Sequence, residues 1–202
     1  MAAPATLRTF IAIELPPALC AQLSDVMTRL DMALPARAVR WVRAEGIHLT
    51  LKFLGDTPHS QLGPLQSIIA SAAQIVAPFE CSAGDLGCFP NARQPRVVWV
   101  GVRDPAGALE RLQRAIEAGT ARLGYPREAG ERGFNPHLTL GRVGRDVHGP
   151  VAKQIGEIVQ ATKTGELGIV RVDRVNLMKS DLQAGGAIYA RLYDAPLGSQ
   201  AE

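Results

Sequence analysis

The tetrapeptide "HLTL" occurs at residues 48–51 and again, letter for letter, at residues 137–140. The chain has four histidines, and two of them open these tetrads. Each tetrad begins a short apolar run, "HLTLKFLG" in the first copy and "HLTLGRV" in the second, which is typical of a β-strand. A strand that recurs unchanged in the second half of the chain indicates an internal duplication.

The elements around the two tetrads follow the same order. Each half is predicted to form a strand, a helix, the tetrad strand, a second helix and a further strand. In the first half the ranges are 9–15, about 17–32, 48–55, 61–76 and 79–89. In the second half they are 97–102, about 105–123, 137–143 and 149–162, followed by two closing strands at 167–182 and 187–195.

The remaining histidines keep the same spacing. His59 follows His48 by eleven residues, and His148 follows His137 by eleven, each in the turn before a predicted helix. The repeat has two copies and a period of half the chain, which predicts two pseudo-symmetric lobes. We expect one domain over residues 1–202, with lobes of about 1–95 and 96–202. The extra C-terminal strand could return to the first lobe, so that strands are exchanged between the lobes.

The tetrads carry the chemistry. Side chains alternate along a strand, so His48 and Thr50 share one face while the leucines bury on the other, and His137 with Thr139 does the same. Taken alone, one copy would simply be a half-buried strand whose histidine is hydrogen-bonded within the protein. Two copies facing each other offer two imidazoles, which act as base and acid near pH 7, and two hydroxyls that donate to phosphate oxygens. This set suits in-line phosphoryl transfer with no obligatory metal.

Three further residues are candidates for substrate binding. Lys52 continues the polar face of the first tetrad and could add positive charge at a phosphate, although a solvated rim lysine is an equal reading. Arg142 is one residue out of phase with Thr139, so it reaches the site only through a bulge or a strand end. Phe89 lies beside a strand end and could stack on a base, but core packing is its more common role.

Composition narrows the class of protein. Of 202 residues, 47% are hydrophobic and 20% charged, which is typical of a globular protein. The net charge of +3 suits an anionic partner such as RNA, but a small net charge of this kind is also common because it keeps proteins soluble. Three cysteines without a Cys-x-x-Cys pair predict neither a disulfide framework nor a zinc cluster. No apolar run reaches the length of a membrane span. We expect the protein to be cytoplasmic and monomeric.

Cofactor motifs are missing from the chain. The histidines lie in four separate places, without a His-x-His pair or a carboxylate cluster nearby. No glycine-rich loop of the Walker or dinucleotide-binding type occurs. The sequence therefore predicts no metal site and no nucleotide cofactor.

The tetrads and their flanks resemble the bacterial and archaeal RNA 2′,3′-cyclic phosphodiesterase family, also known as 2′-5′ RNA ligases, within the two-histidine phosphoesterase superfamily. The resemblance spans nearly the whole chain and rests on "RTFIAIELP", "WVRAEGIHLTLKFLGD", "FPNARQPRVVWVGV", "FNPHLTLGRV" and "VNLMKSDL". It implies an α+β fold with a cleft between two antiparallel sheets and helices outside. It also implies hydrolysis of an RNA 2′,3′-cyclic phosphate end to a 2′-phosphomonoester.

The resemblance further implies roles for the tetrad residues. His48 would donate a proton to the leaving 3′-oxygen, His137 would activate water, and Thr50 and Thr139 would hold the phosphate oxygens. Because the tetrads are identical, the sequence alone does not assign donor and acceptor. The same site could run in reverse and join RNA ends through a 2′-5′ bond.

Two other functions remain open at this point. The substrate could be a small nucleotide, such as an ADP-ribose cyclic phosphate, or a 2′-5′-linked oligonucleotide. Alternatively, the chain could be a non-catalytic module that binds RNA ends.

Overall fold

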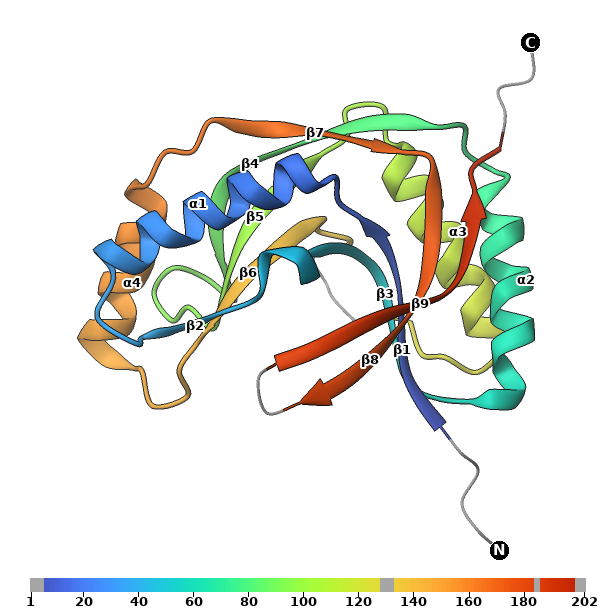
Figure 1. Ribbon diagram of the computed structural model, residues 1–202, viewed down its shortest axis with the longest axis horizontal. Coiled ribbons are helices and arrows are strands. Elements are labelled where there is room, and N and C mark those ends of the chain that lie inside the picture. Colours follow the sequence, from blue (N-terminus) through green and yellow to red (C-terminus); the bar gives the residue numbers. More distant parts are fainter. Residues whose placement is uncertain (1–5, 128–132, 184–185, 199–202) are drawn as a thin grey trace, which may run out of the picture.

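A computed structural model describes residues 6–127, 133–183 and 186–198. Nine strands form one strongly curled sheet in the order β7-β4-β5-β6-β3-β1-β8-β9, with β2 beside β6 (Figure 1). All of the strand pairs are antiparallel. The predicted α+β fold with two lobes is therefore confirmed.

Each lobe takes strands from both halves of the chain. The first lobe contains β3 (His48–Pro58), β1 (Thr6–Glu14), β8 (Arg174–Gln183) and β9 (Gly186–Pro196). The second lobe contains β7 (Glu166–Val172), β4 (Phe79–Phe89), β5 (Val97–Arg103), β6 (His137–Val143) and the short β2 (Val39–Trp41). The strand order reads symmetrically outward from the β6–β3 junction, as a duplicated fold requires.

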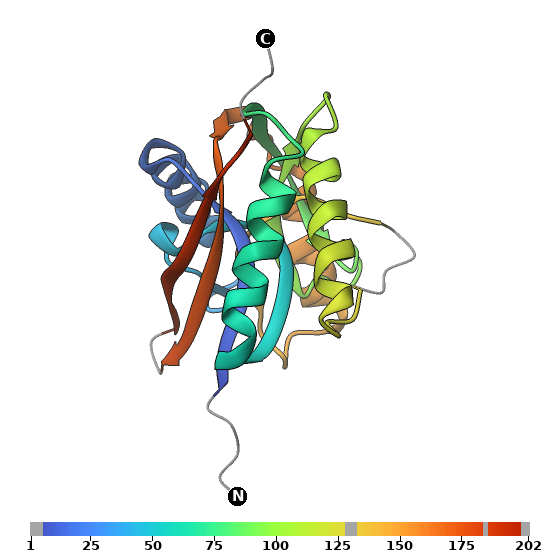
Figure 2. The same ribbon diagram turned by 90° about the vertical axis from the view of Figure 1, so that its right-hand side faces the viewer.

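Four helices in the described ranges cover the outer face of the sheet. Helices α1 (Pro17–Ala33) and α4 (Gly149–Ala161) pack on β7 and β4 of the second lobe. Helices α2 (Leu62–Ala73) and α3 (Ala108–Arg122) lie side by side and pack on β8, β9 and β3 of the first lobe (Figure 2). Two single-turn 3₁₀ helices, Ala44–Gly46 and His59–Gln61, precede and follow β3.

The core lies between these helices and the sheet. Apolar residues of the strands bury against the helices, for example Ile11 in β1, Leu49 in β3 and Leu138 in β6. We call the opposite face, which no helix covers, the inner face. On it Phe10, Ala12 and Met178 form a small separate cluster with Tyr189. In β3 and β6, burial of the leucines against the helices leaves the alternate side chains of the tetrads on the inner face.

The two lobes join at one point. Strands β3 and β6 share a single residue pair, Leu49 opposite Leu138. The two expected sheets are therefore one curled sheet with a narrow junction. Each of the two leucines is the second residue of a tetrad, so the junction is built by the duplicated sequence itself.

One predicted strand is wrong. The run at residues 167–182 was read as a single closing strand, but it forms β7 and β8, separated at Asp173. The chain turns there because β7 pairs with β4 in the second lobe and β8 pairs with β1 in the first. Local apolar pattern does not reveal this change of lobe, since both strands are equally rich in valine and leucine.

Candidate functional site

The four tetrad residues surround the junction of the lobes. His48 and Thr50 flank Leu49, and His137 and Thr139 flank Leu138, the residue paired with it. Continuing this antiparallel register by one residue in each direction sets His48 opposite Thr139 and Thr50 opposite His137. With the leucines buried, all four polar side chains lie on the inner face. The fold thus brings the two tetrads together at one place, as expected from the sequence.

Both imidazoles are held in the same way. The Nδ1 atom of His48 lies 2.8 Å from the carbonyl oxygen of Gly46, and Nδ1 of His137 lies 2.8 Å from that of Asn135. A carbonyl only accepts, so each Nδ1 carries the donated hydrogen. Nε2 is then the atom that takes up or releases a proton in each ring. The identical hydrogen bonds fix the tautomer and the orientation of two potential acid–base groups.

Aromatic side chains enclose the first histidine. The ring of Phe10 stacks on His48 at 4.5 Å between centroids, and Tyr189 meets it edge-on at 4.9 Å. This burial lowers the pKa of His48, and the hydrogen bond to Gly46 opposes the shift. A lowered pKa makes the protonated ring a stronger acid.

The second histidine has a matching aromatic pair. Phe89 meets the His137 ring edge-on at 4.8 Å, and Trp99 lies 6.3 Å away. Phe89 also packs 5.1 Å from Trp99. Phe89 therefore lies beside the tetrad in contact with both His137 and Trp99, and its stacking on a base stays a prediction.

Neither tetrad hydroxyl is engaged by another group of the described residues. Thr50 and Thr139 are half-buried on the inner face. Within the described ranges, no hydrogen bond links either hydroxyl to another protein group. Two donors on one face, each next to an oriented imidazole, suit the non-bridging oxygens of a phosphate.

A β-bulge follows each threonine. In β3, Ala12 pairs with Thr50 and Ile11 with Lys52, which leaves Leu51 as an extra residue. In β6, Trp99 pairs with Thr139 and Val98 with Gly141, so Leu140 is extra. A bulge shifts the alternation of every residue that follows it. The two copies therefore share a change of face directly after their tetrad threonines.

The bulge overturns the expectation for Lys52. Its side chain is fully buried on the helix side, where Nζ lies 3.0 and 2.9 Å from the two carboxylate oxygens of Glu117. Nζ also donates to the carbonyl oxygen of Pro126 at 2.8 Å. Lys52 was predicted to lie on the site face, and that prediction is wrong. Instead it ties β3 to α3 and to the segment that follows α3.

The same bulge has the opposite effect on Arg142. Arg142 pairs with Val97, while its neighbour Gly141 pairs with the fully buried Val98. Directly opposed residues in an antiparallel pair share a face, so Arg142 lies on the inner face with Thr139. Its side chain is exposed.

Three residues beside the site were not found from the sequence. Phe10, Trp99 and Tyr189 come from strands distant in the chain, and each contacts a tetrad histidine. Each lies in a predicted strand, and only the pairing of β1, β5 and β9 with their neighbours brings it to the inner face. The alternation in "RTFIAIEL", where Phe10 is out of step with Ile11 and Ile13, was the one available signal.

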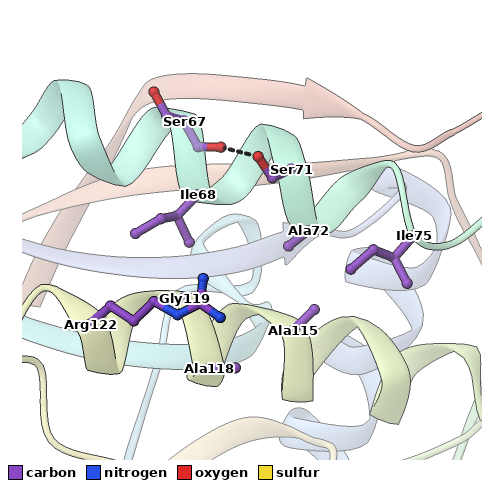
Figure 3. Close-up of a pocket in the computed structure, with 9 residues that line it drawn as sticks. All are labelled: Ser67, Ile68, Ser71, Ala72, Ile75, Ala115, Ala118, Gly119 and Arg122. Carbon is purple, nitrogen blue, oxygen red and sulfur yellow. Dashed lines mark hydrogen bonds between the residues drawn. The ribbon is translucent and has the colours of Figure 1, made fainter.

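A groove among the described residues lies away from the tetrads. It has a volume of about 360 Å³ and lies on the outer side, between α2 and α3 (Figure 3). Its lining consists of Ser67, Ile68, Ser71, Ala72, Ile75, Ala115, Ala118, Gly119 and Arg122. Neither tetrad histidine contributes to it, and it carries no group suited to acid–base chemistry.

Two searches of the described ranges complete this survey. No cluster of three or more histidine, cysteine or carboxylate side chains that could hold a metal ion occurs there. None of the helices in those ranges is both long and apolar enough to cross a membrane.

Comparison with known proteins gives a consistent result. A curated relative from Methanothermobacter thermautotrophicus, named RNA 2′,3′-cyclic phosphodiesterase, is 35% identical over 183 residues, covering 90% of this chain and 94% of the relative. A relative of the same name from Archaeoglobus fulgidus is 29% identical over 92% of this chain and 98% of its own.

Solved structures agree with the sequence relatives. Escherichia coli LigT complexed with 3′-AMP superposes with a TM-score of 0.72 at 28% identity, covering 96% of this chain and 99% of LigT. TT0787 of Thermus thermophilus gives 0.73 at 25% identity, covering 96% and 100%. The family model for the 2′-5′ RNA ligase superfamily matches residues 15–184. This chain therefore belongs to the 2′-5′ RNA ligase superfamily.

Proposed function

We propose that this protein hydrolyses the 2′,3′-cyclic phosphate at an RNA end to a 2′-phosphomonoester. The observation that carries the proposal is the pair of oriented imidazoles and two unengaged hydroxyls around the Leu49–Leu138 junction. The name RNA 2′,3′-cyclic phosphodiesterase, shared by relatives 26–35% identical to this chain, supports the same activity. The expected partner is therefore RNA with a cyclic phosphate terminus.

The reaction divides between the two tetrads. His137 Nε2 takes a proton from water while the water oxygen bonds to phosphorus. The bond from phosphorus to O3′ breaks in line with this attack, and His48 Nε2 donates a proton to O3′. The hydroxyls of Thr50 and Thr139 donate hydrogen bonds to the non-bridging oxygens, which carry more charge in the transition state.

This distribution of roles agrees with the surroundings of the two rings. Burial lowers the pKa of His48, which makes its protonated form a stronger acid than an ordinary imidazolium. Each proton transfer passes through the Nε2 atom that faces away from a backbone carbonyl. The acid, the base and the phosphate donors all come from side chains, and we expect no metal or cofactor requirement.

The three other residues considered for substrate binding have different positions in the structure. Arg142 stays a candidate for binding the anionic substrate, because it shares the inner face with Thr139. Phe89 supports His137. Lys52 is not proposed again as a binding residue.

We also propose that the protein acts as a monomer in the cytoplasm. The cysteines Cys20, Cys81 and Cys88 are all free, as suits a reducing compartment. Light scattering coupled to size exclusion would give the mass in solution, and 21.6 kDa is expected for one chain.

The test of the proposed reaction uses a short RNA that ends in a 2′,3′-cyclic phosphate, incubated with the protein in excess EDTA. We expect turnover to a product that loses phosphate to a phosphomonoesterase and that comigrates with a 2′-phosphate standard, not with a 3′-phosphate standard. A 3′-phosphate product would reverse the direction of attack. A lack of turnover with intact binding would favour an RNA-end binding module.

The substrate class needs a parallel assay. A 2′,3′-cyclic mononucleotide, an ADP-ribose cyclic phosphate and a 2′-5′-linked oligonucleotide are compared with the RNA under the same conditions. We expect the highest kcat/KM for the RNA. A higher value for either alternative would reassign the substrate while leaving the two-histidine site in place.

A further inference from the structure

A buried amide near the start of β8 is left without a hydrogen bond to the described part of the chain. The side chain of Asn176 is 0% exposed, and neither its Nδ2 nor its Oδ1 has a partner among the described residues. Its neighbours Val175 and Leu177 bury in the core, so Asn176 lies on the inner face. Native proteins supply a hydrogen-bond partner for nearly every buried polar group. Asn176 therefore points to a partner from outside these residues.

The amide lines a small pocket where the chain crosses between the lobes. The pocket has a volume of about 90 Å³ and is formed by Ile13 and Glu14 at the end of β1, by residues 171–174, and by Asn176. The chain passes from β7 of the second lobe to β8 of the first at Asp173. A bound water needs roughly 10–15 Å³ of such space, whereas pockets for organic ligands begin at about 300 Å³. The volume therefore suits a few water molecules and excludes a nucleotide.

The charged groups of this pocket are already paired. Each charged side chain that lines it has an oppositely charged partner at 3.7 Å or less, in the pairs Glu14–Arg191, Asp173–Arg174, Arg174–Asp194 and Arg171–Glu80. The lining itself contributes two carboxylates and two guanidinium groups, so it favours neither a cation nor an anion. The Asn176 amide donates through Nδ2 and accepts through Oδ1. Water is a small neutral molecule that satisfies both groups.

We propose that this pocket binds ordered water molecules, which hydrogen-bond to both amide atoms of Asn176 and fasten the crossover between the lobes. The polar lining supplies the further partners that a buried water uses, typically two to four in all. Glu14 ends β1 opposite His48, the first residue of the first tetrad, and Asp173 connects the lobes. The waters thus stabilise the place where the strand beside the first tetrad meets the second lobe. This site is separate from the tetrads and does not depend on the proposed function.

A high-resolution crystal structure of the wild type tests the site directly. We expect electron density for water within hydrogen-bond distance of both Nδ2 and Oδ1 of Asn176. An amide turned onto a protein group overturns the proposal, and so does a pocket closed around the side chain. A bound ion or buffer molecule in place of water also overturns it, because the ligand would then be of another class.

The melting temperature gives a second test, whose sign depends on whether the amide is hydrogen-bonded. Asn176→Leu keeps a side chain branched at Cγ and removes both polar atoms. Loss of hydrogen bonds to water should lower the melting temperature by about 4 °C in a protein of this size, whereas removal of an unsatisfied amide should raise it. Thr57→Val is the matched control, because Thr57 is also 0% exposed and its hydroxyl is bonded to Thr9 and Tyr125. It should lower the melting temperature similarly, and a rise or no change in Asn176→Leu alone overturns the proposal.

Magnetic relaxation dispersion of the water oxygen separates lost waters from poor packing, because it counts the water molecules that stay bound while the protein tumbles. The wild type and Thr57→Val should hold the same number of such waters, and Asn176→Leu should hold fewer. An equal count in the wild type and Asn176→Leu overturns the proposal even if the melting temperature falls. Should Asn176→Leu fail to fold, the crystal structure of the wild type decides alone.

Discussion

The two tetrads place identical residues on the inner face but differ after their bulges. Behind Thr50 the chain buries Lys52 under α3 and exposes Phe53 on the inner face beside Phe10. At the equivalent positions behind Thr139 it has Gly141 and the exposed Arg142. The same backbone therefore presents an apolar side chain in the first lobe and a cation in the second. Under the proposed function, the acid and base residues are those that the two lobes share, and the cation that only the second lobe carries is a candidate for binding the anionic substrate.

The largest expected effect is on kcat and follows from the histidine that each lobe carries. Replacing His48 or His137 by alanine should each lower kcat by about 10²- to 10⁴-fold, the usual contribution of a positioned acid or base. His59→Ala and His148→Ala are matched controls, because these histidines lie at the same offset from each tetrad. Steady-state kinetics on cyclic-phosphate RNA provides the measurement. Full activity in either tetrad variant would contradict the assignment of both histidines as acid and base.

The second-largest expected effect is on stability and concerns the buried ion pair of the first lobe. Lys52→Met leaves the Glu117 carboxylate, which is 12% exposed, without its partner, and should cost about 3–5 kcal/mol of unfolding free energy. The double variant Lys52→Met/Glu117→Leu should recover most of this loss, since no buried charge is left. Urea denaturation measures both. A loss of activity at unchanged stability would instead indicate that Lys52 binds the substrate phosphate.

The threonines should show a smaller and symmetric effect. Thr50→Val and Thr139→Val each remove one hydroxyl donor at nearly constant volume, and kcat/KM should fall about tenfold in each. Thr→Ser at either position keeps the hydroxyl and should retain most of the activity. A large effect in only one lobe would show that the phosphate lies off the symmetry axis.

The smallest effect concerns the pKa of His48. Burial by Phe10 and Tyr189 disfavours the charged ring, so Tyr189→Ala should raise the His48 pKa toward its ordinary value. NMR titration of the ring resonances measures the shift, with the His59 resonance as the control. A lowered pKa also means that the unfolded chain binds this proton more readily, so the fold loses stability as the pH falls through the ordinary histidine pKa. Tyr189→Ala should lessen that loss.

The sequence was a good guide wherever the pattern is local. Apolar spacing predicted α1 and α3 and the tetrad strands, and the repeat of His48 and His137 identified the candidate site. It failed at Asp173, where an even apolar run divides between two lobes, and at Lys52, where a bulge changes the face. Both depend on which strand becomes the neighbour, and strand register is set by non-local pairing that no short window contains. The inner-face position of Arg142 depends on the same kind of pairing.

The most direct test of the central claim, that two identical tetrads perform opposite proton transfers, replaces the leaving oxygen. A cyclic substrate with sulfur in place of O3′ expels a thiolate, which needs little help from an acid. Single-turnover rates are measured for the wild type, His48→Ala and His137→Ala on the oxygen and sulfur substrates. The account predicts that sulfur restores most of the activity of His48→Ala and none of that of His137→Ala. Equal deficits on both substrates, or rescue of His137→Ala alone, would contradict it.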